Sequence, residues 1–494
     1  MFEGVARRVL SRRATPLERL ERFSRFTPEY GPEWGSGGVF GLRYHKGTLY
    51  FNLAFEAEAH FVKESDEKVY RYELVGPGPA SGGDTYNAVA AVDDNIYFGG
   101  WVHTPAVISK DDGTLHFYNK FSHVHKYNTQ SADVSLLWKE GAGDKLGWAG
   151  EVSEILHNPI QDELLLARAD GDRNLGIYEL SLPDNHVKRI CEEPGLHGSI
   201  FMDHAAFNTG GLFMDGVQLI SLRDHGARRY GLDLSGKASR DGGPTSLTYV
   251  GSICSAFGRL FAFIRSGIVV GDPLSESEED ALSFVRLFDF PGCQVSPFRT
   301  NSLPVGGGIL TAYNSLPDML GLDRAPIVMP SVLVYVTPPS VRVVAALGSR
   351  VTSLETCSSK LLVAANTMPN VSSYRTTALD SGHRDILQLS PDILSKHPPP
   401  LDISLTATDL GTSHWGGIPL SGYRKTKMTV RTTKANTLQI FEYDLSLPNP
   451  TGVQQETSKL SKGKNSLDLG GFEGIVSFRF TEADPQARVG IHLS

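Results

Sequence analysis

Four carboxylate side chains in the first half of the chain suit acid–base chemistry. They are Glu56, Glu151, Asp170 and Asp203, and each lies at the start or the end of an expected strand. In glycoside hydrolysis one carboxylic acid protonates the leaving oxygen, while a second carboxylate acts as nucleophile or activates water. The two groups lie about 5–5.5 Å or about 6.5–9.5 Å apart. The four residues are therefore candidate catalytic groups of a glycoside hydrolase.

Side chains that suit sugar binding lie close to these carboxylates in the sequence. Tryptophan rings offer an apolar face on which a sugar can stack, while charged and amide groups can fix its hydroxyls. Glu56, Glu58 and His60 alternate along the chain, so on one continuous strand they would point to the same side. The candidate substrate-binding residues are Glu58, Asn87, Trp101, Trp148 and Arg168.

A second interpretation is a metal centre built from histidines. His123 and His125 are two residues apart, so a strand would place both imidazoles on one side. His103, His204 or Glu58 could complete the ligand shell of a divalent metal ion. A lyase or a lactone hydrolase would use such an ion as a Lewis acid. The opposing interpretation is that these histidines are bonded to neighbouring backbone, and the sequence establishes no cofactor.

A third interpretation involves no catalysis. Many folds serve as scaffolds, and a polar channel can bind a glycan or a protein partner without turning anything over. The sequence leaves the three functions open, with the glycoside hydrolase favoured.

A recurring hairpin pattern supplies the elements that would position these residues. A strand-like run meets a tight polar turn and is followed by a second apolar run. The pairs are Val39–His45 with Thr48–Ala54, Val89–Val92 with Asn95–Gly99, Val152–His157 with Glu163–Ala167, His204–Phe207 with Gly211–Met214, Val250–Ala256 with Arg259–Ile264, Val295–Thr300 with Gly308–Tyr313, and Val351–Thr356 with Lys360–Ala365. The second runs begin at residues 48, 95, 163, 211, 259, 308 and 360.

A period close to about 50 residues with several strands per repeat indicates a β-propeller. Seven recurrences predict seven blades over residues 30–395, and six blades is the nearest alternative. A stacked pair of sandwiches is the other architecture considered. The long step from residue 95 to residue 163 predicts an insertion around Ser131–Trp148. In a propeller, the start of each first strand and the end of each second strand share one face, so the candidate residues should converge there.

The two ends of the chain differ from the repeat. Residues 1–29 carry clustered arginines among apolar residues and predict a basic helical segment. Three consecutive prolines, 398–400, interrupt the strand pattern. Beyond them, alternating runs predict that residues 396–494 form a linker and a C-terminal β-sandwich.

Composition excludes some classes of protein. The 494 residues are 40% apolar and 21% charged, which allows a substantial core in an all-β fold. The net charge of −8 argues against a nucleic-acid partner, because phosphate binding usually requires a basic surface. The sequence shows no membrane-length apolar stretch and no signal peptide, which predicts a cytoplasmic protein. The four cysteines are widely spaced and predict buried thiols, and the oligomeric state is open.

Several segments resemble a known family. They are Tyr30–Gly35, Phe40–His45, Leu53–His60, Tyr86–His103, Trp148–Gly176 and Thr437–Phe480. These segments resemble an uncharacterised family of thermophilic crenarchaea, known as a domain of unknown function. The resemblance implies a thermophilic archaeal source. It implies no activity, substrate or catalytic residue.

Overall fold

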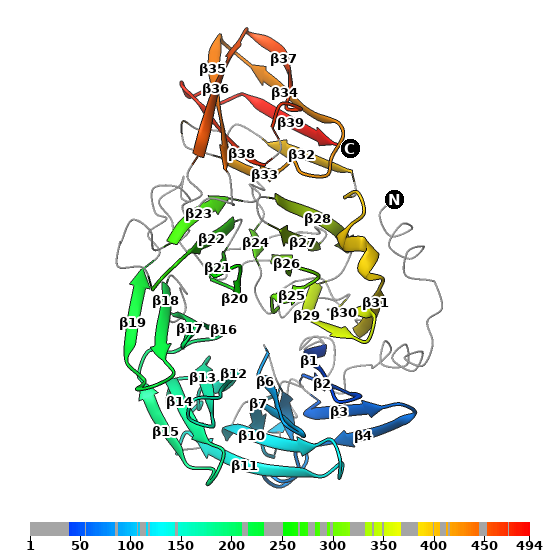
Figure 1. Cartoon of the computed structure of the whole chain (residues 1–494), viewed down its shortest axis with the longest axis vertical. Coiled ribbons are helices and arrows are strands. Elements are labelled where there is room, and N and C mark those ends of the chain that lie inside the picture. The colour runs from blue at the N-terminus through cyan, green and yellow to red at the C-terminus, as the bar shows by residue number, and fades with distance from the viewer. Residues whose placement is uncertain are drawn as a thin grey trace. The chain divides into compact units, whose positions relative to one another are not determined.

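The computed structural model describes an all-β chain. It describes residues 39–54, 56–83, 87–105, 107–108, 115–116, 119–143, 147–209, 216–231, 250–264, 267–274, 282–286, 294–296, 300–316, 331–337, 340–347, 350–366, 384–398, 400–405, 412, 415–443, 452–472 and 474–494. In these ranges the regular structure is antiparallel β-sheet and one short 3₁₀ helix, η6 (Pro391–Leu394), which confirms the prediction of an all-β chain (Figure 1). No helix within them is long and apolar enough to cross a membrane. The predicted helical segment 1–29 lies outside the described residues.

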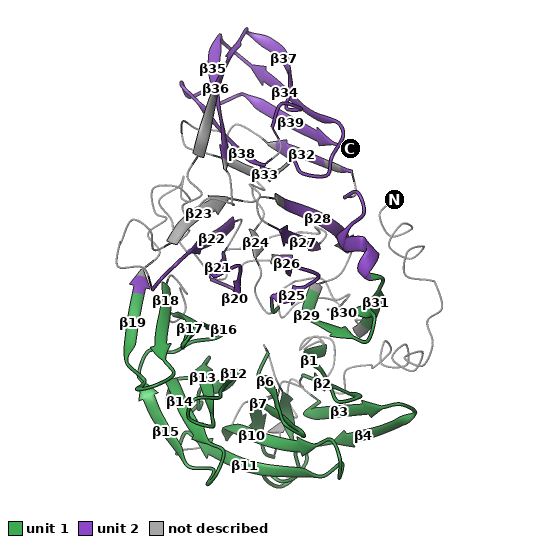
Figure 2. Ribbon diagram, viewed as in Figure 1, with its two compact units in different colours: residues 1–229, 299–301, 348–390 green, residues 230–298, 302–347, 391–494 purple. Residues whose placement is uncertain are grey.

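The chain divides into two compact units, which Figure 2 colours separately. Unit 1 comprises residues 1–229, 299–301 and 348–390, and unit 2 comprises residues 230–298, 302–347 and 391–494. Each unit therefore combines segments that are distant in the sequence.

The described residues of unit 1 form five antiparallel sheets and a two-stranded ribbon. The first sheet has the order β1-β2-β3-β4, with β1 (Val39–His45), β2 (Thr48–Leu53), β3 (Glu58–Lys63) and β4 (Asp66–Tyr70). The second sheet has the order β11-β10-β7-β5, and β6 also pairs with β7. Its strands are β5 (Ser81–Gly83), β6 (Val89–Val92), β7 (Asn95–His103), β10 (Lys120–Asn128) and β11 (Val134–Gly141). The ribbon is β8 (Val107–Ile108) with β9 (Leu115–His116).

The third and fourth sheets of unit 1 each run in simple chain order. The third consists of β12 (Glu151–Asn158), β13 (Glu163–Ala169), β14 (Gly176–Ser181) and β15 (Val187–Cys191). The fourth consists of β16 (Gly198–Phe201), β17 (His204–Thr209), β18 (Gly216–Ser221) and β19 (Ala227–Gly231), the last ending just beyond the unit boundary. The fifth sheet comes from the later segment and consists of β29 (Arg350–Cys357), β30 (Lys360–Asn366) and β31 (Arg384–Leu389).

Unit 2 contains four sheets. The first two are β20 (Ser252–Ala256), β21 (Arg259–Ile264), β22 (Gly267–Gly271) and β23 (Leu282–Arg286), then β24 (Gln294–Ser296), β25 (Leu303–Val305), β26 (Gly308–Leu316), β27 (Ser331–Thr337) and β28 (Ser340–Leu347). The other two have the orders β32-β39-β34-β37 and β33-β38-β35-β36. Their strands are β32 (Leu401–Leu405), β33 (Trp415–Pro419), β34 (Thr426–Thr432), β35 (Asn436–Tyr443), β36 (Gly452–Leu460), β37 (Gly463–Asp468), β38 (Ile475–Phe480) and β39 (Arg488–Leu493).

Tight turns with positive φ join the first two strands of several sheets. Lys46 and Gly47 connect β1 to β2 with φ of 45° and 82°, and Phe257 and Gly258 connect β20 to β21 with φ of 54° and 67°. Two consecutive residues in this conformation match the twist of a two-residue hairpin. These polar or glycine-containing turns are the ones from which the hairpins were predicted.

The fourth sheet differs from its prediction. His204–Phe207 was expected to be a first strand, but His204 begins β17, whose earlier partner is β16. The turn between them contains Met202, with φ of 55°, and Asp203. The short β16 begins with a glycine and follows a polar segment, so its sequence lacks the apolar run of the other first strands. The predicted insertion is also corrected, because residues 134–141 form β11, a strand of the second sheet.

The sheets of unit 1 pack through their first strands. β29 packs beside β1, β1 beside β6, β6 beside β12 and β12 beside β16. Two buried hydrogen bonds join the first pair: Thr352 Oγ1 donates to the carbonyl of Val39 at 2.5 Å, and Ser353 Oγ accepts from the N–H of Leu42 at 3.0 Å. The last sheet of the unit in sequence is therefore joined to the first.

Unit 2 has one continuous apolar core. Buried side chains of β21, such as Phe263, belong to the same cluster as Val343 of β28. The same cluster includes Met428 of β34 and Phe478 of β38, which belong to the two C-terminal sheets. These two sheets therefore share their buried faces with each other and with the rest of the unit.

Candidate functional site

A buried ion pair between two tryptophan rings lies where the second and third sheets meet. Lys120 Nζ lies 3.2 Å from Glu151 Oε2 and donates a 2.7 Å hydrogen bond to the backbone carbonyl of Asp170. The same ammonium lies 5.5 Å from the ring centroid of Trp101 and 5.4 Å from that of Trp148. Lys120 and Glu151 are almost fully buried, whereas Trp148 is 40% exposed. We call these four side chains the tryptophan–lysine site.

Close backbone packing holds Trp148 in this position. The N–H of Trp148 donates to Asp172 Oδ1 at 2.7 Å, and its carbonyl accepts from the N–H of Asp172 at 3.0 Å. A Cβ added at Gly171 would lie 2.5 Å from the backbone nitrogen of Gly150, so only glycine permits this approach. The segment after β13 is thereby locked against the segment that enters β12.

Arg168 has a structural position next to this site. Its guanidinium is fully buried, forms an ion pair with Glu140 and donates to the carbonyl of Gly150 at 3.1 Å. The guanidinium carbon also lies 4.9 Å from the ring of Trp138 and 4.7 Å from that of Tyr178. The sequence analysis predicts that Arg168 binds substrate. To do so, the Arg168 guanidinium would have to leave these partners.

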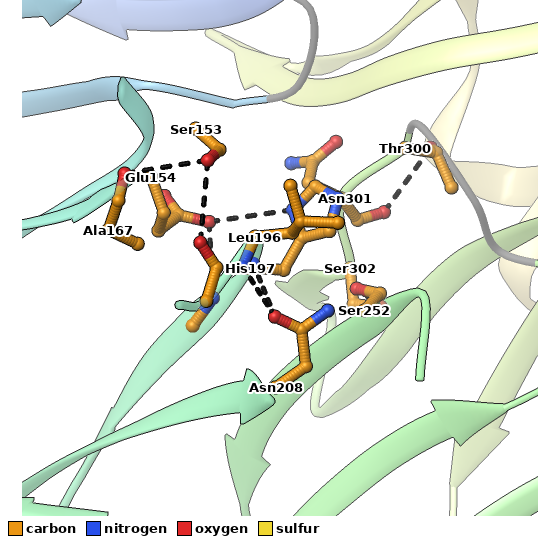
Figure 3. Close-up of polar contacts among 12 residues, drawn as sticks. Ser153, Glu154, Ala167, Leu196, His197, Asn208, Ser252, Thr300, Asn301 and Ser302 are labelled. Carbon is orange, nitrogen blue, oxygen red and sulfur yellow. Dashed lines mark hydrogen bonds and ion pairs between the residues drawn. The ribbon is translucent and has the colours of Figure 1, made fainter. Parts of the chain in front are cut away.

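A second polar cluster surrounds Glu154 in β12. Its Oε2 accepts a hydrogen bond from the N–H of Gly198 at 3.3 Å and lies 3.7 Å from Nδ1 of His197. Asn87, which precedes β6, forms an isolated bridge to Glu154. Asn208 Oδ1 accepts from the N–H of His197 at 2.8 Å and so fixes the segment that faces Glu154. Figure 3 shows the contacts of Glu154 and Asn208 with this segment.

A β-bulge directs the Glu154 side chain. The pairing of β12 with β13 shifts between Val152 and Glu154, so Ser153 is the extra residue and Glu154 lies opposite Ala167. Ala167 belongs to an apolar cluster with residues of the fourth sheet, such as Phe207. The bulge therefore places Glu154 on the side of its sheet that faces β16.

Burial controls the protonation of this cluster. It raises the pKa of the Glu154 carboxyl to about 8, and neither the Gly198 N–H nor the positive charge of Arg43 offsets this. Burial also lowers the pKa of His197 to about 3. At neutral pH Glu154 therefore carries a proton that it can donate, and His197 is neutral.

Arg43 and Glu355 extend the polar cluster across the first strands of unit 1. Arg43 of β1 lies 3.6 Å from Glu355 of β29, and its Nη2 donates to the carbonyl of Val89 at 3.5 Å. Glu355 also accepts hydrogen bonds from the N–H of Tyr44 at 3.3 Å and of Thr356 at 2.8 Å. The Arg43 side chain is 33% exposed, so solvent reaches this part of the cluster.

Glu58 and Glu56 do not lie on one continuous strand. Ala57 between them has a φ of 53°, Glu58 begins β3, and Glu56 forms an isolated bridge with Gly82. Of the three residues expected on one side of a strand, only Glu58 and His60 point to the same side. Glu58 Oε2 lies 3.3 Å from His60 Nε2.

The Glu58 carboxylate is part of a charged group on the first sheet. Burial favours its neutral form, but the hydrogen bonds and charges of His60 and Arg71 outweigh burial and lower the pKa of Glu58. Burial likewise disfavours protonated His60, but its hydrogen bonds to Glu58 and Glu67 prevail and raise the pKa of His60. The group is a buried ion pair, with the exposed Arg71 2.9 Å from Glu58.

The four histidines of the predicted metal centre do not lie together. His123 and His125 are joined by a 3.0 Å hydrogen bond between their Nδ1 atoms, and Nε2 of His125 is bonded to the hydroxyl of Tyr70 at 3.0 Å. Burial lowers the pKa of His123 to about 3 and that of His125 far below its usual value. His103 instead packs edge-on against Trp101, with ring centroids 5.2 Å apart.

His204 and Asp203 lie at the hairpin turn of the fourth sheet. His204 Nδ1 is 2.9 Å from Asp203 Oδ1, and the exposed Arg223 lies 3.4 Å from Asp203 Oδ2. The misplaced hairpin explains why both were expected at the start of a first strand. In the structure Asp203 and His204 are instead paired with each other and with Arg223.

Three functional candidates were absent from the prediction: Glu154, Arg43 and Glu355. Each is a charged residue in a first strand, flanked by residues of ordinary strand type. The sequence signal that could have found them is a charge in an otherwise buried strand, since such a charge requires a partner.

Comparison with known protein families identifies the family of this chain. A family described as "Uncharacterized protein conserved in archaea (DUF2139)" matches residues 49–374. The chain belongs to this family. The resemblance noted in the sequence is thereby confirmed, and the family description assigns no activity to a DUF2139 protein. A search of curated proteins finds no match.

Solved structures show only distant likeness to this DUF2139 chain. A nidogen/laminin complex has 11% identity and a TM-score of 0.29, covering 47% of this chain and 75% of that one. A glycoside hydrolase family 43 arabinoxylan arabinofuranohydrolase from Bacillus subtilis, in complex with cellotetraose, has 11% identity and a TM-score of 0.28, covering 82% and 93%. Saccharomyces cerevisiae Sqt1 has 10% identity and a TM-score of 0.34, covering 72% and 97%. At these scores the likenesses carry no functional argument.

Proposed function

We propose that the chain is a carbohydrate-active enzyme of the glycoside hydrolase type. Its architecture would be a seven-bladed β-propeller over residues 30–395, followed by a C-terminal β-sandwich within residues 396–494. Seven sheets with a repeated antiparallel order, and the packing of β29 on β1, support the propeller. The shared apolar faces of the two last sheets support the sandwich.

The observation that carries the function is the pair of glutamates in β12. Glu151 forms an ion pair with Lys120, whereas burial raises the pKa of Glu154 to about 8. Two carboxyl groups whose surroundings hold one charged and one neutral can serve as base and acid. Three residues of extended chain span at most about 10 Å, so the two residues lie close together along one strand.

Each group has a role in this hypothesis. Glu154 donates its proton to the glycosidic oxygen, and Glu151 acts as the charged carboxylate that stabilises the positive sugar carbon or activates water. The exposed ring of Trp148 offers a stacking surface for a sugar. The predicted roles of Glu56, Asp170 and Asp203 remain predictions, with Asp203 placed at a hairpin turn.

Hydrolysis of matched substrates tests the proton donor. Glu154→Gln should lower kcat/KM on ordinary oligosaccharides about 10²–10⁴-fold. It should spare dinitrophenyl glycosides much more, because their leaving group needs no proton. Trp148→Ala should mainly raise KM. Equal losses on both substrate types, or full activity of Glu154→Gln, would refute the assignment.

A second candidate is a propeller that binds a glycan without cleaving it. It is favoured by the burial of Glu151, which is 1% exposed and already paired with Lys120. This function predicts saturable binding to a glycan that is lost in Trp148→Ala, with no turnover of any bound sugar.

A further inference from the structure

We propose that Glu163, Glu179 and His225 form a binding site for a divalent metal ion of the zinc type. The site is independent of the proposed hydrolase function. Glu163 begins β13, Glu179 lies in β14, and His225 lies in the turn after β18. Three different elements of unit 1 thus contribute one ligand each.

The distances between the donor atoms suit one small cation. His225 Nε2 lies 2.7 Å from Glu163 Oε1, and His225 Nδ1 lies 3.1 Å from Glu179 Oε2. One donor atom from each residue can be chosen so that all three lie within 4.8 Å of one another. Ligand atoms around a tetrahedral zinc ion are about 3.3 Å apart. Only one nitrogen of His225 can bind the ion, so the carboxylate that now contacts the other nitrogen must rotate toward it, closing a gap of up to about 1.5 Å from the present limit of 4.8 Å.

The ligands are held by their own neighbours. Asn158 Nδ2 donates to Glu163 Oε1 at 2.7 Å and to the carbonyl of Leu222 at 2.9 Å, which ties the first ligand to the chain that carries His225. His225 itself sits in a closed turn, with φ of 60° and its N–H bonded to the carbonyl of Ser221. Such outer contacts fix the orientation of metal ligands before the ion arrives.

The charge of the cluster favours a cation. Two carboxylates flank one imidazole, and the ammonium of Lys188, which lies 3.8 Å from Glu179, is exposed to solvent. The side chains of the three ligands are 6%, 17% and 15% exposed, so water reaches the site but screens it only partly. A dication would balance both carboxylates at once.

The donor set indicates which ion. One imidazole and two carboxylates match zinc and neighbouring transition metals, whereas calcium and magnesium prefer oxygen ligands alone. Three protein ligands leave a fourth position for water. Since Glu163 and Glu179 belong to the third sheet and His225 to the turns of the fourth, the bound ion would fasten the two sheets together.

Zinc titration of the full chain tests the proposal. After treatment with a chelator and its removal, isothermal titration with ZnCl2 should show one site per chain, and the melting temperature should rise. His225→Asn keeps a residue that tolerates the left-handed turn, and Glu179→Gln changes a side chain that is only partly buried. Each variant should weaken this site at least tenfold and abolish the thermal shift.

A matched control separates this site from surface binding. His492 and Asp402 form another histidine–carboxylate pair, with exposed side chains 2.5 Å apart, in the C-terminal sheets. His492→Ala should bind zinc as the unaltered chain does. Equal zinc binding by His225→Asn and the unaltered chain, or no stoichiometric binding at all, would overturn the proposal and leave His225 as an ion-pair partner of the two glutamates.

Discussion

At the scale of single residues, the surroundings of the two glutamates in β12 decide their charge. Glu151 meets the ammonium of Lys120, which removes the cost of burying a carboxylate. Among the described residues no cation is in direct contact with Glu154, and burial raises its pKa to about 8. The same residue type, three positions apart, thus supplies a charged and a neutral carboxyl.

The raised pKa of Glu154 predicts a pH-dependent contribution to stability. The folded chain keeps this proton up to about pH 8, whereas an unfolded carboxyl loses it near its ordinary pKa of 4.5. The contribution of the protonated Glu154 to stability is therefore complete below about pH 4.5 and is lost as the pH rises through 8. Glutamine cannot ionise, so Glu154→Gln should gain stability relative to the unaltered chain as the pH rises, by up to about 5 kcal/mol.

Melting temperatures of both proteins at pH 5 and pH 8 check this prediction. At pH 5 the variant should melt at or slightly below the temperature of the unaltered chain, and at pH 8 above it. Comparing the two at each pH cancels the contributions of groups that do not contact Glu154, such as His60 on the first sheet. A melting difference that does not vary with pH would contradict the prediction.

The ion pair of Lys120 and Glu151 predicts a large cost when only one partner is removed. Lys120→Met leaves a buried carboxylate without its cation, which should reduce the free energy of unfolding by about 3–5 kcal/mol. Adding Glu151→Gln should recover much of this loss. Denaturant unfolding of both variants measures the effect.

An exposed ion pair provides the comparison. Lys434 and Glu482 lie 2.7 Å apart, with side chains 48% and 64% exposed. Lys434→Met should lower the free energy of unfolding far less than Lys120→Met, because solvent screens the exposed pair. Similar losses for Lys434→Met and Lys120→Met would mean that burial of the Lys120 pair has no energetic consequence.

At the scale of elements, sequence reasoning succeeded where the turns carry their own signal. Lys46-Gly47 and Phe257-Gly258 marked hairpins whose second strands, β2 and β21, start at the predicted residues. It failed at β16, because four residues starting with glycine give no apolar run. It also missed Glu154, because alternation along β12 cannot reveal the bulge at Ser153 that redirects this side chain. Partner side chains from other sheets, such as Lys120 for Glu151, follow only from the packing.

The junction of β13 and β14 predicts a site that tolerates only glycine. Gly176 has a φ of 126°, and a Cβ there would lie 2.2 Å from the carbonyl oxygen of Cys191. Gly176→Ala should therefore destabilise the chain by about 2–4 kcal/mol through backbone strain and overlap together.

Gly463 separates these two causes. It has a φ of 105°, but an added Cβ meets nothing within 4 Å. Gly463→Ala should thus show the backbone strain without the overlap and lose clearly less stability in the same unfolding assay. Equal losses would show that the contact with Cys191 is unimportant.

At the scale of the whole molecule, β1 and β29 join two parts of unit 1 that are more than 300 residues apart in the chain. The N–H of Leu42 is buried and donates across this contact to Ser353 Oγ at 3.0 Å. A buried N–H without a partner costs about 1–3 kcal/mol, so Ser353→Ala should lower the free energy of unfolding by that amount. Thr356→Val, in the same strand, is the control, because the Thr356 hydroxyl bonds only to its neighbour Glu355. If both variants unfold at the same denaturant concentration, the contact between β1 and β29 does not stabilise unit 1.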